Sequence, residues 1–488
     1  MTTEAVIRIF FAFTISSLFA YIAYNNQERD KRFSSKEDGG IRYHPHIGSA
    51  ILPVYLTALF LYSMIKLGPD ATLNYLPAMC FDVFLHISIY YLVLILCLSK
   101  LCRYVSARAC AQLWMIPNFL YITYHSFMAI PKPALILYFP PAVIKVVLYL
   151  WITGFIVIMT WKLIAHIHFR HSILRHAYAV SDPDILTIWH REQEAAGYKK
   201  NPSCLVISPN VHTPLSIGFF PRSIRVVLPK RSYTPEELIL IFRHEIVHIG
   251  RDDCSAKFFL TFCTAMCWFN PLMWIAYRRC CDDLELSCDE TVLVNANAPM
   301  RRQYADLLLR TAGDDRGFTS CLSNSAKALQ YRLKNVINPR KKLPGCVLIG
   351  LTFFLLIMSF GYISLSYEEG SGQVYIFENT NLSEYSVQNI YIHGTDGFQY
   401  YNCCDEDALK EYLAGIRFCK ITGNYTFPDN VQNVNIRFYG PEGVFHVSLT
   451  DEALKITPLH EEKIYSKKYH CVEAIDWDYL SSLLLTSE

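Results

Sequence analysis

His244-Glu245-Ile246-Val247-His248 is the most informative stretch of this sequence. On an α-helix, residues four positions apart lie one above the other on the same face. The imidazoles of His244 and His248 can therefore reach one metal ion from a single helix, and zinc accepts such nitrogen ligands. Glu245 is expected to lie beside the ion and to act as the general base that takes a proton from the attacking water. The stretch thus predicts one Zn²⁺ per chain and a hydrolytic site.

The residues before this motif indicate that it lies on a helix. Thr234 can cap the helix, Pro235 suits its first position, and Glu237 completes a capping box. We expect the helix to run to about Ile249. One helix and two short strands are expected upstream of it, at Pro183–Tyr198, Ser203–Ser208 and Ile224–Leu228.

The third zinc ligand must come from another part of the chain, because a catalytic zinc usually has three protein ligands and one open position. We expect it to be Glu285, in Glu285-Leu286-Ser287-Cys288-Asp289. Asp289 lies one turn later on the same face and can accept a hydrogen bond from a ligand imidazole. Asp253 is a second candidate for accepting that hydrogen bond, and it is also an alternative to Glu285 as the third zinc ligand. The other competing carboxylates are Asp282, Asp283 and Glu290.

The composition indicates a membrane protein. Of the 488 residues, 52% are hydrophobic and 18% are charged, whereas a soluble protein carries about 25% charged residues. The net charge of +2 argues against direct nucleic-acid binding. Six apolar runs approach the roughly 20 residues that span a bilayer, at Ala5–Tyr24, Ile47–Leu67, Met79–Leu101, Leu113–Ile130, Pro141–Ile164 and Cys346–Leu365. A further run, Ala256–Ala276, contains Asn270-Pro271, and we expect it to lie against or partly within the membrane.

The flanking charges predict an orientation for these spans. Lys and Arg follow the first, third and fifth runs and precede the last, whereas Gly68–Pro77 has none and Pro131–Pro140 has one. Cytoplasmic loops retain such residues. We therefore predict a multi-pass cell-membrane protein whose N-terminus and C-terminal tail lie outside. Four regions follow: a transmembrane region of about five spans at 1–166, a cytoplasmic α+β zinc peptidase domain at 167–345, a last transmembrane helix at 346–366 and an extracellular α+β domain at 367–488.

The tail alternates short strands with helices. Val434–Phe438 and Val444–Leu449 flank a Gly-Pro-Glu-Gly turn and predict a hairpin, and Ala408–Ile416 and Trp477–Leu485 predict helices. One disulfide is consistent with the oxidising side of the membrane, with its pairing open among Cys403, Cys404, Cys419 and Cys471.

Several motifs, in order, resemble the BlaR/MecR antirepressor metallopeptidase family. Besides the zinc-helix motif, they are Ser208-Pro209, Thr213-Pro214-Leu215, Gly218, Val227-Leu228-Pro229, Arg251-Asp252-Asp253, Trp268-Phe269-Asn270-Pro271-Leu272-Met273-Trp274 and Glu285–Asp289, so that the resemblance covers about Pro202–Val294. It implies a gluzincin fold, with His244, His248 and Glu285 as ligands and Glu245 as base. It also implies an enzyme that responds to an extracellular signal and cleaves a cytoplasmic regulator, such as a transcriptional repressor, or itself. A peptide substrate would pair with a sheet edge beside the zinc helix.

The tail departs from the penicillin-sensing members of that family. Ser366–Glu488 has no Ser-x-x-Lys pattern and is too short for their sensor domain, so the extracellular ligand is left unidentified. Two other functions stay open at this stage. One is a catalytically silent membrane receptor or scaffold, against which the intact Glu245 argues. The other is a housekeeping membrane protease of the HtpX type, which needs no outer sensor.

Overall fold

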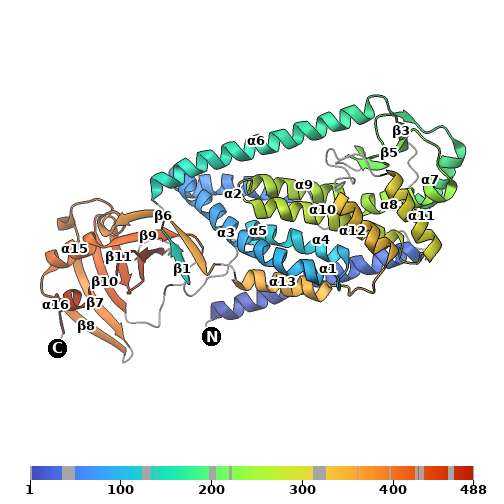
Figure 1. Ribbon diagram of the computed structural model, residues 1–488. Helices are drawn as coiled ribbons and strands as arrows, with labels where there is room; N and C mark the ends of the chain where they lie inside the picture. The colour runs from blue at the N-terminus through green and yellow to red at the C-terminus, as the bar shows by residue number, and fades with distance from the viewer. Residues whose placement is uncertain are drawn as a thin grey trace.

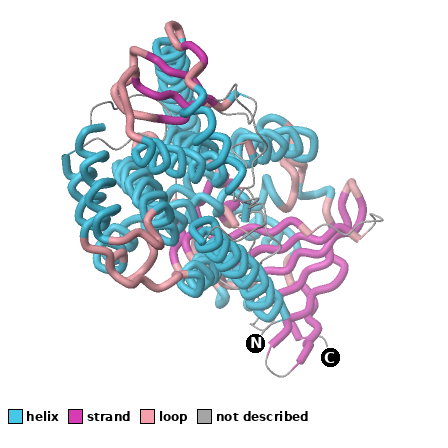
Figure 2. Tube along the Cα trace, turned by 90° about the vertical axis from the view of Figure 1, so that its right-hand side faces the viewer, coloured by secondary structure: helices cyan, strands magenta, loops and turns pink. Residues whose placement is uncertain are grey.

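The computed structural model describes residues 3–35, 50–123, 133–138, 140–196, 205–218, 223–311, 326–359, 361–394, 397–423, 427, 433–459 and 466–486. A helical body and a C-terminal sheet domain lie side by side, and one long helix, α6 (Pro141–Leu174), runs from the sheet domain to the far end of the helical body (Figure 1). Figure 2 shows the sheet domain extending away from the packed helices.

Apolar helices build most of the helical body. They are α1 (Thr3–Ser35), α2 (Ile51–Leu67), α3 (Pro69–Leu101), α4 (Ala107–Met115), the 3-10 helix η1 (Ile116–Phe119), α5 (Leu120–Thr123), α6 and α13 (Cys346–Ser359). Within the described residues, three stretches are long and apolar enough to cross a membrane, namely Ala5–Lys31, Pro69–Leu98 and Val146–Leu174. Large apolar side chains such as Phe10, Ile65 and Val347 are exposed on these helices. Exposed apolar side chains on such helices suit contact with lipid.

The helix boundaries differ from the predicted spans in three places. The predicted loop Gly68–Pro77 is mostly helical, because α3 begins at Pro69, directly after Gly68 with its positive φ of 80°. The fourth span is divided into α4, η1 and α5 around Pro117. The last helix ends at Ser359 instead of 366, and Ile363–Ser371 forms strand β6. The beginning of the second predicted span and the end of the fourth lie outside the described residues.

In its described residues, the central region combines a small sheet with six helices. The sheet order is β2 (Tyr178–Ala179), β3 (Leu205–Ser208), β5 (Arg225–Pro229) and β4 (Leu215–Ile217). Around it lie α7 (Pro183–Ala195), α8 (Pro235–Arg251), α9 (Asp253–Met266), α10 (Pro271–Val292), α11 (Ala298–Thr311) and α12 (Ala326–Ile337), of which α7 and α8 pack through Trp189 and Phe242. The predicted helices α7 and α8 and strands β3 and β5 are present, whereas β2 and β4 were not predicted.

The apolar run Ala256–Ala276 forms parts of two helices, α9 and α10, which fold back along each other (Figure 1). The turn is made by Asn270, whose side-chain oxygen caps α10 by accepting from the Leu272 backbone N–H at 3.0 Å. Its amide nitrogen also donates to Ser88 Oγ of α3 at 2.8 Å. The hairpin is therefore anchored inside the helical body, and its second helix returns toward α8.

The C-terminal domain is built on a ten-stranded sheet. Its strands are β1 (Leu135–Leu137), β6 (Ile363–Ser371), β7 (Ser386–Gly394), β8 (Gly397–Cys403), β9 (Arg417–Ile421), β10 (Asn433–Gly440), β11 (Gly443–Leu449), β12 (Ala453–Pro458), β13 (Lys467–Cys471) and β14 (Leu484–Thr486), with helices α14 (Gly372–Tyr375), α15 (Glu406–Gly415) and α16 (Trp477–Ser482). The predicted hairpin is β10–β11, and the two predicted helices are α15 and α16. The cysteines of this domain, Cys403, Cys404, Cys419 and Cys471, all have free thiols.

One strand of that sheet comes from the N-terminal half of the chain. β1 pairs in parallel with β6 through Leu135–Ile363, and it directly precedes α6. At its other end, α6 leads into β2, which pairs with β3 of the central sheet. The sequence did not predict this arrangement, in which one helix connects the edges of two sheets.

A buried charge cluster joins the first helix to the helix that carries the His pair. Asp30 of α1 accepts a hydrogen bond from Arg251 Nη2 at 2.8 Å and also pairs with Arg108 of α4. Arg251 further donates to Ser287 Oγ of α10 at 2.7 Å. Because Arg251 follows His248 by less than one turn, this cluster fixes the C-terminal end of α8.

We predict that Asp30→Asn destabilises the protein by about 3–5 kcal/mol, because it leaves two buried guanidinium groups without their shared carboxylate. Thermal unfolding of the detergent-solubilised protein would measure this loss. The control is Glu28→Gln, which removes an exposed pair with Lys31 and should cost about 0–1 kcal/mol. Equal, small losses in both variants would contradict a structural role for the cluster.

Candidate metal centre

The helix that carries the His pair begins as the sequence predicts. Thr234 Oγ1 accepts from the Glu237 backbone N–H at 3.2 Å, and the Glu237 carboxylate accepts from the Thr234 N–H at 3.0 Å. Pro235 occupies the first turn. The helix ends at Arg251, and the left-handed conformation of Asp252 (φ 56°) turns the chain into α9.

His244 and His248 point to the same side of α8, and both are buried. Their Nε2 atoms lie 3.1 Å apart. Glu285 of α10 meets them there, with its Oε2 3.5 Å from each Nε2 atom. The structure therefore brings together the three side chains that the sequence proposes as ligands.

The competing carboxylates are placed elsewhere. Asp253 reaches the other nitrogen of His248, Asp283 faces α4, and Glu290 binds Lys342 and the Ala107 backbone N–H. Asp282 belongs to none of the potential metal-binding groups found among the described residues. Of the five candidates, Glu285 has the geometry required of a third ligand.

Hydrogen bonds define which nitrogen of each imidazole carries the proton. His248 Nδ1 lies 2.7 Å from Asp253 Oδ2, and a carboxylate can only accept, so Nδ1 is the donor. Tyr304 OH donates to Asp289 Oδ1 at 2.6 Å and must therefore accept from His244 Nδ1 at 2.9 Å. Both Nε2 atoms are left with lone pairs that face each other.

Three acceptor atoms, two Nε2 and Glu285 Oε2, thus face one another at 3.1–3.5 Å. Acceptors at such distances repel unless a cation lies between them. Zinc ligands at roughly 2.0–2.2 Å in a tetrahedron lie about 3.3–3.5 Å apart, so the triangle fits such an ion. A proton can also occupy this space. Burial opposes protonation of His248, but Cys288, Glu285 and Asp253 raise its pKa well above the ordinary value.

Two buried cations balance the carboxylates of α10. Lys257 of α9 is 0% exposed and its Nζ lies 3.0 Å from Glu285 Oε1. Arg332 of α12 binds both oxygens of Asp289 at 2.7 Å and lies 3.6 Å from Glu285 Oε2. Burial opposes ionisation of Glu285, yet Lys257 and His248 hold its pKa well below the usual range.

The sequence did not identify Tyr304, Lys257 or Arg332 as part of the site. Only Lys257 gave a signal, because a lysine within an apolar run is unusual and often functional. Asp289 was expected to accept a hydrogen bond from a ligand imidazole. Instead it reaches His244 chiefly through Tyr304, because Asp289 Oδ1 itself lies 3.5 Å from His244 Nδ1.

Glu245 is 2% exposed, on the same turn of α8 as His244. His212 is exposed in the connection between β3 and β4.

We predict that His244→Ala lowers the zinc content by one equivalent per chain and that Glu285→Gln weakens binding of the same ion, because each change removes one acceptor of the triangle. Metal content of the purified full-length protein, measured by elemental analysis, would show the loss. Glu290→Gln is the matched control on the same helix and should retain about one zinc per centre. The ligand assignment would be wrong if His244→Ala held as much zinc per chain as the wild type, or if the zinc content fell only in Glu290→Gln.

We further predict that Lys257→Met destabilises the metal-free protein by about 3–5 kcal/mol, since it removes the nearest counter-charge of the buried Glu285. The metal-loaded protein should lose less, because the ion then neutralises the same carboxylate. Thermal unfolding with and without zinc would therefore show a larger stabilisation by zinc in the variant than in the wild type. Lys327→Met, at an exposed position of α12, is the control. An unchanged effect of zinc would contradict this role of Lys257.

The comparisons with known proteins concern the region that contains this centre. Residues 131–336 match the family model described as BlaR1 peptidase M56. The chain is also 25% identical over 195 residues to the regulatory protein BlaR1 of Bacillus licheniformis, an alignment that covers 38% of this chain and 32% of that protein. The chain thus spans about a third of the length of this relative. These matches confirm the resemblance to the BlaR/MecR family that the sequence motifs indicate.

Proposed function

We propose that this chain, as a relative of the BlaR1-type M56 peptidases, is a membrane-anchored zinc endopeptidase of signal transduction. In this proposal His244, His248 and Glu285 hold the metal and Glu245 is the general base. The observation that carries it is the triangle of three buried acceptor atoms, which calls for a cation. Every residue of the triangle lies within the matched region 131–336.

A bound zinc ion would polarise both the attacking water and the carbonyl of the scissile peptide bond. Glu245, one residue after His244 on the same helix, would take the proton from that water and pass it to the leaving amine. Asp253 and Tyr304 would keep the two imidazoles in the tautomer that presents Nε2. Lys257 would hold Glu285 ionised, so that it is ready to act as a ligand.

The substrate that fits this proposal is a protein segment in the cytoplasm, such as part of a transcriptional repressor or of the chain itself. β4 is the candidate for pairing with it, because β4 lies at the end of the central sheet and contacts α8. A peptide adding to a sheet is held by its main chain, which suits an endopeptidase. The flanking charges support a cytoplasmic central region and an extracellular sheet domain.

Two physical links support a signalling role. The first is α6, which joins β1 of the sheet domain to β2 of the central sheet. The second is Asp82 of α3, which accepts from Thr422 Oγ1 of the sheet domain at 2.8 Å and pairs with His86 at 3.0 Å. A ligand that shifts the sheet domain would therefore move two helices of the helical body.

We predict that Glu245→Ala keeps its zinc and loses proteolysis, because the variant retains all three ligands and lacks the base. Quantitative proteomics of cells that express the wild type or the variant should reveal a regulator that is cleaved only by the wild type. Glu236→Ala, at an exposed position in the first turn of the same helix, is the matched control and should cleave normally. Cleavage of the same regulator by both proteins would remove Glu245 from the mechanism as the base, and cleavage by neither would favour a catalytically silent receptor.

A further inference from the structure

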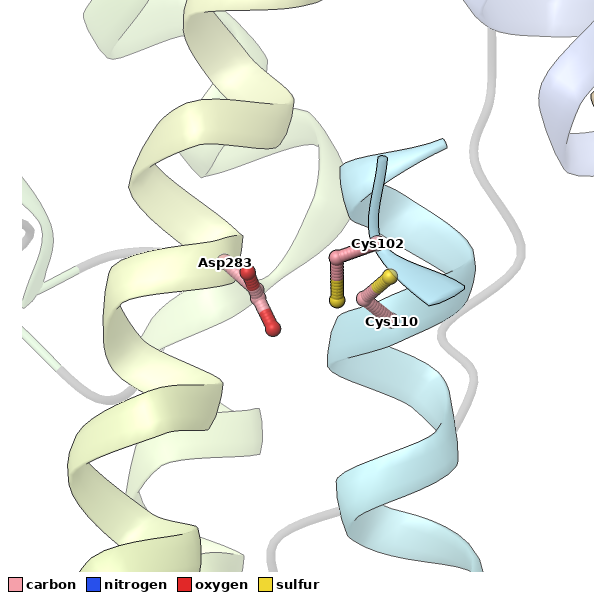
Figure 3. A group of neighbouring side chains, drawn as sticks. All are labelled: Cys102, Cys110 and Asp283. Carbon is pink, nitrogen blue, oxygen red and sulfur yellow. The ribbon is translucent and has the colours of Figure 1, made fainter. Parts of the chain in front are cut away.

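A second cluster of potential metal ligands lies between α10 and the corner that joins α3 to α4. It consists of Cys102 at the end of α3, Cys110 of α4 and Asp283 of α10, whose side chains face one another (Figure 3). One ligand atom of each residue lies within 4.8 Å of the other two. The two thiols are close enough to share a hydrogen bond.

Asp283 is buried and has no ion-pair partner among the described residues, although the charge of Lys342 acts on it from farther away. Its exposed fraction is 5%, and its hydrogen-bond donors are neutral: Trp114 Nε1 at 3.0 Å and Tyr331 OH at 3.4 Å. Within the described part of the chain, no Lys, Arg or His forms an ion pair with Asp283. A buried carboxylate is costly unless a cation balances it.

The other buried carboxylates of the same helix show what Asp283 lacks. Glu285 has Lys257 and Asp289 has Arg332. Glu290, nearer the surface, has Lys342. In place of a basic side chain, Asp283 faces two thiols. Thiolates become cation ligands when they lose their protons to a metal ion.

We propose that Cys102, Cys110 and Asp283 form a second metal site, which takes a thiolate-binding ion of the Zn²⁺ class. Binding would release one proton from each thiol and leave two thiolates and one carboxylate around the ion. Two sulfur ligands select zinc-like ions over Mg²⁺ and Ca²⁺, which prefer oxygen. Cys102 is partly exposed, so the ion has a path from solvent and a fourth position is open to water.

A disulfide between the two cysteines is the competing use of the same atoms. The α3–α4 corner carries Lys100 and Arg103, which by the charge rule lie on the cytoplasmic side. Cytoplasmic thiols are kept reduced, and this favours a metal over a disulfide.

Such an ion would connect the α3–α4 corner to the helix that carries Glu285, two residues after Asp283. It would fix α10 from the side opposite to the His pair. The site would thus act on the first centre by holding its third ligand in place. The inference does not depend on proteolysis, because the cluster shares none of its residues with the proposed catalytic set.

Cobalt(II) binding by the reduced, chelator-treated full-length protein in detergent would test this site. Only thiolate ligands give the intense sulfur-to-cobalt absorption in the near ultraviolet, so the His–His–Glu centre contributes none. We expect this absorption to saturate at about one equivalent in the wild type. It should vanish in Cys102→Ser with Cys110→Ser, while the weaker visible bands of cobalt at the first centre remain. Cys97→Ser, which changes an exposed cysteine of α3, should keep it.

Asp283→Asn provides a second test that keeps both thiols and the oxygen that accepts from Trp114. It should weaken cobalt binding at the thiolate site by more than about tenfold, the lower end of the loss seen for outer-shell partners. The proposal would be overturned if the fully reduced wild type gave no sulfur-to-cobalt absorption. It would also be overturned if the absorption survived in the double serine variant, and its loss in Cys288→Ser would then assign it to the group beside His248.

Discussion

The buried carboxylate of Glu285 is the constraint on which the central region depends. A carboxylate placed against two imidazoles and away from water is costly unless positive charge surrounds it. Lys257 supplies part of that charge from α9, and the space between the three acceptor atoms accommodates an ion that would supply the rest. The α9–α10 hairpin makes both contacts possible, because the turn at Asn270 brings Lys257 and Glu285 to the same depth.

A chain of buried hydrogen bonds around the centre determines the orientation of its side chains. Arg332 holds Asp289, Asp289 accepts from Tyr304, and Tyr304 accepts from His244. Asp253 orients His248 directly, by accepting a hydrogen bond from its Nδ1. Removing one member of such a buried set leaves its partner uncompensated, which is why these networks specify a single arrangement even where their net contribution to stability is small.

Local signals in the sequence predicted the elements that depend on local interactions. The capping box at Thr234 and the four-residue spacing of the histidines needed only neighbouring residues, and α8 begins as they indicate. Glu285 could be ranked first among five carboxylates, but its contact with the histidines depends on how the hairpin folds. Tyr304 and Arg332 were missed because their partners lie far away in the chain, and neither has a distinctive neighbourhood. β2 and β4 were missed because two or three residues are too few to show a strand period.

The most informative departure from expectation is β1, since it changes how the two sheets are related. Three residues, Leu135–Leu137, place the N-terminal end of α6 in the sheet domain by main-chain pairing with β6. A continuous helix of 34 residues, which at about 1.5 Å per residue is roughly 50 Å long, then reaches the edge of the central sheet. In the first third of this helix, Trp151 donates to the Met266 backbone carbonyl of α9 at 2.7 Å. A displacement of the sheet domain along α6 would therefore move two parts of the protein. One is the α9–α10 hairpin, which carries Lys257 and Glu285, and the other is the set of strands beside α8. In the proposed signalling enzyme, this single helix links the sheet domain directly to the central sheet beside the metal centre.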